Sequence, residues 1–102
     1  MQFLLIAHDG SDPEAPHRRQ QARAAHLLAA AELRRAGHFI IGGALLDASG
    51  AMVGSAIVFE FPDRTALDRY LATDPYVSGK VWQQIEIHAF RVAQLPPLAD
   101  AD

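Results

Sequence analysis

The side chains available for chemistry in this sequence are histidines, carboxylates, hydroxyls and arginines, because the chain has no cysteine. That composition excludes disulfides, thiolate metal sites and thiol nucleophiles. Five histidines remain: His8, His17, His26, His38 and His88. No two of them share the i, i+4 spacing of a metalloprotease helix, and no carboxylate–histidine cluster has the spacing of metal ligands. The sequence therefore predicts no metal site.

His26 stands out because it lies in the middle of a segment with helical periodicity. It belongs to a mostly apolar row of residues at helical spacing, which we expect to face the core. The row consists of Ala22, His26, Ala29, Ala30 and Leu33. Arg23 precedes it by one turn on the same side. A histidine here is either a hydrogen-bonded core residue or a group that exchanges protons, since an unperturbed histidine titrates near pH 6.5. The residues alone leave both interpretations open.

Three more polar residues are candidates, each with an ordinary alternative. Asp74 follows a predicted helix, where the helix dipole disfavours a carboxylate by roughly 0.3–1 kcal/mol, but Asp-Pro is also a common turn. Ser55 lies among apolar neighbours in a predicted strand, so its hydroxyl either bonds the backbone or faces a pocket. His8 ends the first strand and either faces the same cavity or is exposed. Tyr76 and Trp82 are interpreted as packing residues.

The elements that must position these residues follow the order strand–helix–strand–strand–helix–strand. Gly37 stands where a left-handed helix end belongs, Asp63 suits a helix N-cap, and Gly42-Gly43 indicates a bulge or a close approach to the backbone. The expected elements cover residues 2–8, 16–36, 38–46, 52–61, 63–72 and 82–92. This split βαβ order predicts a ferredoxin-like α+β fold with a four-stranded antiparallel sheet of order 4-1-3-2.

Both faces of the two central strands are apolar. In the first strand Phe3 and Leu5 oppose Leu4 and Ile6. Two helices cover only one face of such a sheet, and the other would expose more apolar area than most monomers do. We therefore expect a face-to-face homodimer, or a higher oligomer built from it.

Length and charge limit the remaining choices. A chain of 102 residues holds one domain, expected over residues 1–93, with a tail at 94–102. A net charge of −3 argues against a nucleic-acid partner, and the arginines between Arg18 and Arg35 are interpreted as a solvated helix face. No apolar run approaches the ~20 residues needed to cross a bilayer, and the start does not resemble a signal peptide. We expect a soluble, cytoplasmic protein with no membrane partner.

Several short motifs, taken in order, resemble the YCII-related (YciI-like) family. They are Arg23-Ala24-Ala25-His26-Leu27, Gly37, Gly42-Gly43, Gly54-Ser55 and Asp74-Pro75-Tyr76. The resemblance runs from the first strand to about Val92. Two departures are Gly43-Ala44, where many relatives have Gly-Pro, and the Pro-Pro tail.

The resemblance implies a ferredoxin-like dimeric α/β barrel and a site built on a His–Asp pair, here His26 and Asp74. Ser55 and Arg23 would be companions in binding substrate, and His8 is a further candidate from its position. The implied function is a cofactor-free acid–base enzyme of the isomerase or lyase type, similar to a dehydrochlorinase or a muconolactone isomerase. Its substrate would be a small cyclic or aromatic oxygenated molecule. The alternatives are a non-catalytic module that binds a small ligand and a structural subunit of a larger complex.

Overall fold

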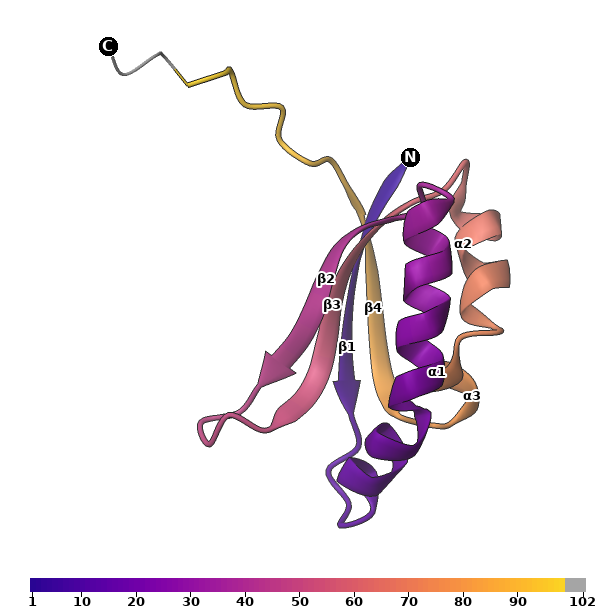
Figure 1. Ribbon diagram of the computed structural model, residues 1–102, viewed down its shortest axis with the longest axis vertical. Helices are drawn as coiled ribbons and strands as arrows, with labels where there is room; N and C mark the ends of the chain where they lie inside the picture. The colour runs from indigo at the N-terminus through magenta and orange to yellow at the C-terminus, as the bar shows by residue number, and fades with distance from the viewer. Residues whose placement is uncertain (99–102) are drawn as a thin grey trace.

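The computed structural model describes residues 1–98 and has the predicted element order, with one short helix added (Figure 1). The strands are β1 (Gln2–Asp9), β2 (Phe39–Leu46), β3 (Met52–Glu60) and β4 (Trp82–Phe90). The helices are α1 (Ala15–Arg35), α2 (Arg64–Leu71) and α3 (Pro75–Ser78). Helix α3 was not predicted from the sequence and occupies a single turn between α2 and β4.

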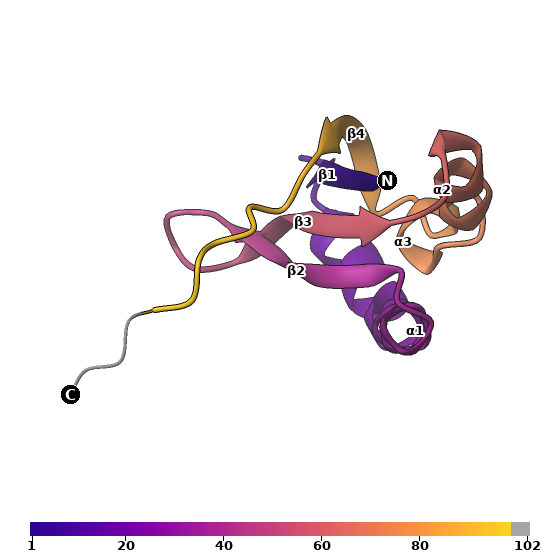
Figure 2. The same ribbon diagram turned by 90° about the horizontal axis from the view of Figure 1, so that it is seen from above.

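The four strands form one antiparallel sheet in the order β2-β3-β1-β4. This is the predicted 4-1-3-2 order read from the opposite edge, so the ferredoxin-like α+β fold is confirmed. Helices α1 and α2 both lie on one side of the sheet (Figure 1), and Figure 2 shows the strands side by side from above. The central strands β1 and β3 pair in register, with Leu5 opposite Ile57 and Ala7 opposite Ser55.

Local signals set the ends of the two longer helices. Gly37 follows α1 at φ +83°, a left-handed conformation that favours glycine. Asp63 precedes α2, and its carboxylate accepts the Ala66 backbone N–H at 2.8 Å. Both predicted caps are confirmed, so α1 and α2 keep the positions that the site requires.

The core lies between the sheet and the helices. Its buried residues come from alternate positions of the strands and from α2 and the segment after it: Phe3, Leu5, Ala7, Ile57, Phe59, Phe61, Leu67, Leu71, Tyr76, Val81 and Trp82. On the opposite face of the sheet Leu4 and Ile6 are only half-buried, and Ile41 is 65% exposed. No helix within residues 1–98 covers that face.

Of the glycine pair in β2, Gly42 marks a close approach of side chains rather than a bulge, while Gly43 has open space beside it. Register shifts against β3 occur between Phe39 and Ile41 and beyond Leu45, not at the glycines. A Cβ on Gly42 would lie 2.7 Å from the Phe39 ring and 3.0 Å from Ile57, because both side chains fill the space beside it. A side chain at position 42 would therefore displace the Phe39 ring or Ile57.

The chain after β4 leaves the domain without regular secondary structure (Figure 1). Leu95 and Leu98 in this segment are 81% and 96% exposed. The predicted tail extends over residues 94–102, of which 99–102 lie outside the described residues. Among the described residues, no helix is both long and apolar enough to cross a lipid bilayer.

Candidate functional site

The centre of the candidate site is His26, held on α1 between two aromatic rings. The residue is 7% exposed, as its place in an apolar helical row predicted. Its ring stacks on Tyr76 with centroids 3.8 Å apart and planes 9° from parallel, and it meets Trp82 edge-on at 5.5 Å. These rings fix the orientation of the imidazole.

Asp74 holds the other side of the imidazole. Its Oδ1 lies 3.0 Å from His26 Nδ1 and also accepts the Tyr76 backbone N–H at 2.8 Å, while its Oδ2 accepts the Tyr70 hydroxyl. Because a carboxylate only accepts, Nδ1 carries the proton and Nε2 is left as the acceptor. The carboxylate is 1% exposed, so solvent does not compete for these bonds.

The location of Asp74 differs from the prediction. The sequence was interpreted as placing this carboxylate at the unfavourable C-terminal end of a helix, but α2 already ends at Leu71. Asp74 is the N-cap of α3, where its side chain accepts the Tyr76 N–H. The following Pro75 suits the first position of a helix, since it has no N–H to satisfy. The short helix thus places the Asp74 carboxylate at the Nδ1 edge of the His26 ring and Tyr76 against the face of that ring.

Tyr70, on α2, supports Asp74 from the side away from His26. Burial, followed by the hydrogen bond to Asp74, raises the pKa of the Tyr70 hydroxyl. It therefore remains a donor at neutral pH and holds the carboxylate in place. Burial likewise raises the pKa of Tyr76, despite the nearby positive charges of Arg19 and Arg23.

A second buried polar cluster lies beside the first and centres on Arg19, seven residues before His26 on α1. Arg19 Nη1 donates to both oxygens of Asp9 at 3.0 and 2.9 Å, and Nη2 donates to Ser55 Oγ at 3.2 Å. Trp82 Nε1 donates to the same hydroxyl at 3.1 Å. The guanidinium also lies over the Tyr76 ring, 4.9 Å from its centroid. The two clusters therefore share Tyr76 and Trp82.

Arg19 was not predicted as a site residue, because the arginines from Arg18 to Arg35 were interpreted as a solvated helix face. Arg19 is in fact only 7% exposed. Its spacing of seven from His26 places both residues on one side of the helix, and that signal was present in the sequence. Its partner Asp9 could not be identified, since their contact depends on how α1 lies against β1.

Both clusters border one cavity of about 160 Å³ between α1 and the sheet. It is lined by Arg19, Arg23, His26, Leu27, Ala30, Phe39, Gly42, Gly43, Ala44, Met52, Ser55, Ile57 and Tyr76. Of the residues singled out from the sequence, the structure brings His26, Asp74, Ser55 and Arg23 together around this cavity, with Asp74 behind the imidazole. His8 is not among the lining residues: it is exposed, and alternation along β1 places it on the opposite face of the sheet from Ala7.

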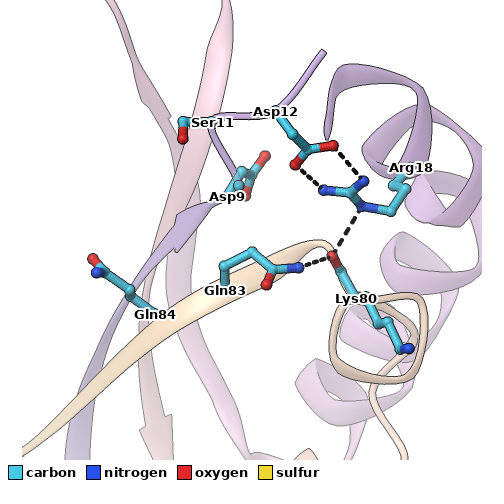
Figure 3. Close-up of a pocket in the computed structure, with 8 residues that line it drawn as sticks. Asp9, Ser11, Asp12, Arg18, Lys80, Gln83 and Gln84 are labelled. Carbon is cyan, nitrogen blue, oxygen red and sulfur yellow. Dashed lines mark hydrogen bonds and ion pairs between the residues drawn. The ribbon is translucent and has the colours of Figure 1, made fainter. Parts of the chain in front are cut away.

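A larger and more open pocket of about 630 Å³ lies beside Asp9, the partner of Arg19 (Figure 3). Its arginine is already engaged, since Arg18 binds both oxygens of Asp12 at 2.7 and 2.8 Å and the carbonyl of Lys80 at 3.2 Å, and the pocket does not border the His26–Asp74 pair. The hydrogen bond from Arg18 lowers the pKa of Asp12 to about 2. The smaller cavity beside His26 is therefore the better site for chemistry. Within residues 1–98 no three side chains of metal-binding type are grouped.

The comparison with protein families gives one match, to the YCII-related domain over residues 1–91. No curated protein matches the sequence.

Solved structures match the fold closely but the sequence only distantly. A 5-chloro-2-hydroxyhydroquinone dehydrochlorinase from Burkholderia phenoliruptrix, in complex with 2,5-dihydroxybenzoquinone, is 21% identical and superposes with a TM-score of 0.80 over 91% of this chain and 96% of that one. SnoaB from Streptomyces nogalater, described as a cofactor-independent oxygenase, is 15% identical with a TM-score of 0.51 over 95% and 96%. These likenesses support the ferredoxin-like fold.

Proposed function

The chain belongs to the YCII-related family, and from that premise we propose that it is an acid–base enzyme of the isomerase or lyase type that acts on a small cyclic oxygenated molecule. The observation that carries the proposal is the His26 Nδ1–Asp74 Oδ1 contact of 3.0 Å beside the cavity. A carboxylate that holds one imidazole nitrogen leaves the other ready to take a proton. No residue within 1–98 hydrogen-bonds Nε2.

In the proposed reaction His26 Nε2 takes a proton from an acidic C–H or O–H of the substrate. The electron pair left behind moves into the ring system and onto its oxygen, and Asp74 stabilises the imidazolium. An isomerase returns that proton to a different carbon. A lyase instead expels a leaving group such as chloride with the electron pair, and the proton passes from His26 to water.

The relatives support the substrate class only by analogy of fold. The dehydrochlorinase is named for the loss of hydrogen chloride from a hydroxylated ring, and its structure holds a dihydroxybenzoquinone. SnoaB is described as working without a cofactor. Loss of hydrogen chloride releases a proton that some group must accept, which is the task proposed for His26. On these grounds we propose that no cofactor takes part.

Exchange of ring protons with D2O tests the function without knowledge of the true product. We expect the protein to accelerate loss of the ring-proton NMR signal of hydroxylated rings such as chlorinated hydroquinones, or to release chloride from them. A protein that binds these compounds in calorimetry but neither exchanges protons nor releases chloride would be a ligand-binding module, and the enzyme proposal would be wrong.

We also propose that two chains associate through the sheet face that lacks helices. Leu4 and Ile6 at its centre are only half-buried, and Ile41 beside them is 65% exposed. Burial of apolar surface contributes a favourable free energy of roughly 25 cal/mol per Å². A patch of this kind therefore favours self-association when that gain exceeds the entropy lost on association.

Light scattering after size-exclusion chromatography at micromolar concentration should give twice the 11.1 kDa mass of one chain. Ile41→Asp should reduce that mass toward one chain, because it places a charge in the proposed interface. Leu28→Asp is the matched control: Leu28 is 70% exposed on α1, on the other side of the sheet. A monomeric wild type, or equal behaviour of both variants, would refute the proposed interface.

A further inference from the structure

The cavity beside His26 carries positive charge without a matching acid on its wall. Arg19, Arg23 and His26 follow each other at i, i+4 and i+7 along α1 and line the same side of it. No aspartate or glutamate is among the lining residues. Asp9 and Asp74 are both buried behind the groups that they bind, so the charged group that a ligand meets without a paired acid is Arg23, with the Arg19 guanidinium beside it.

Arg19 has one donor that nothing in residues 1–98 accepts. Its two terminal nitrogens bind Asp9 and Ser55, but Nε is buried and has no hydrogen-bond partner. Buried donors in proteins are nearly always satisfied, and an exception calls for an explanation. The Arg19 side chain borders the cavity, so an oxygen of a bound ligand is the acceptor that the site can supply once a small shift of the guanidinium uncovers Nε.

Arg23 adds a second cation one turn closer to His26. It is exposed and forms no ion pair within the described part of the chain. A guanidinium presents donors in a plane and suits a carboxylate or a similar delocalised oxygen anion. The Arg23 guanidinium can therefore donate hydrogen bonds to a charged oxygen that binds next to Arg19.

The rest of the cavity wall is apolar, and its volume limits the ligand. The apolar lining comprises Leu27, Ala30, Phe39, Gly42, Met52 and Ile57. The volume of about 160 Å³ is close to that of a cavity known to take one benzene ring, about 150 Å³. One end of the site thus suits a charged oxygen and the other a single ring.

We propose that the cavity binds a single-ring organic monoanion, with its carboxylate or enolate oxygen between Arg19 and Arg23 and its ring against the apolar wall. This proposal specifies the substrate of the proposed acid–base enzyme. It rests on that function, because the reacting carbon of the anion must lie beside His26. When Nε2 removes a proton, the electron pair moves through the ring toward the oxygen that the arginines hold. Donors placed in advance at that oxygen stabilise the charge where it develops.

Binding of benzoate and of its neutral counterpart benzamide tests the proposal without any turnover, so its failure is distinct from failure of the enzyme proposal. Titrations are followed in ¹H–¹⁵N spectra of arginine side chains. We expect benzoate to bind at least about tenfold more tightly than benzamide, as charge-assisted hydrogen bonds are the stronger ones, and to shift the Arg19 Nε–H signal. The anion of 2,5-dihydroxybenzoquinone is the enolate probe, and the tighter of the two anions identifies the oxygen type.

A charge-removing variant and a matched control complete the test. Arg23→Gln should weaken benzoate binding about tenfold and leave benzamide unchanged. Arg34→Gln removes the same charge from an exposed position on α1 outside the cavity and should change neither. Equal affinities of benzoate and benzamide, equal effects of the two variants, or no binding of either anion at millimolar concentration would overturn the proposal.

Discussion

A His26→Asn variant should lose turnover by a factor of about 10²–10⁴ while keeping its fold. General acid–base catalysis by a positioned side chain is worth about that much. The asparagine amide nitrogen can replace Nδ1 as donor to Asp74, so the carboxylate keeps a partner. Nothing replaces Nε2, which is the atom assigned to the proton transfer. The rate of ring-proton exchange in D2O, compared with wild type, measures the loss.

His88→Asn is the control for this variant. His88 lies on β4 with its side chain 56% exposed, away from the cavity, so the exchange rate should be unchanged. Circular dichroism and thermal unfolding show whether both variants are folded. A folded His26→Asn protein with wild-type exchange rates would remove His26 from the mechanism.

Replacement of Arg19 should have the largest effect on stability. Arg19 and Asp9 side chains are 8% and 5% exposed, so Arg19→Met leaves a carboxylate buried without its cation. Breaking a buried ion pair by removing one partner typically costs about 3–5 kcal/mol. The total stability of a small domain is about 5–15 kcal/mol. Urea unfolding should show a large fall in the midpoint.

Two comparisons separate this loss from an ordinary surface effect. The double variant Asp9→Asn with Arg19→Met removes the stranded charge and should recover part of the stability. Arg35→Met breaks an exposed pair with Glu32, whose side chains are 76% and 70% exposed, and should cost less than about 1 kcal/mol. Equal losses for Arg19→Met and Arg35→Met would show that the buried pair is not structurally important.

Local patterns in the sequence were sufficient to predict the element order and the caps. Gly37 and Asp63 act through neighbours a few residues away, and the row through His26 follows from helical period alone. The sheet order followed from the split βαβ arrangement. These features depend on short-range geometry, which the sequence displays directly.

The contacts that complete the site depend on how the elements pack together. Asp9 meets Arg19 across β1 and α1. Tyr70 is only four residues before Asp74, but its bond to Oδ2 depends on the turn that follows α2. A one-turn helix has too few residues for a periodic signal, so Asp74 was interpreted as the end of the preceding helix. Trp82 was interpreted as a packing residue, and its bond to Ser55 required the register of β4 against β1.

The protonation of the His26 ring is the most direct test of the account, because it needs no substrate. Long-range ¹H–¹⁵N NMR of the imidazole distinguishes the two neutral forms by the chemical shifts of Nδ1 and Nε2. For the neutral ring, the 3.0 Å contact with Asp74 predicts a protonated Nδ1 and a bare Nε2 facing the cavity. A ring with its proton on Nε2 would contradict the account, since the atom assigned as base would already be a donor.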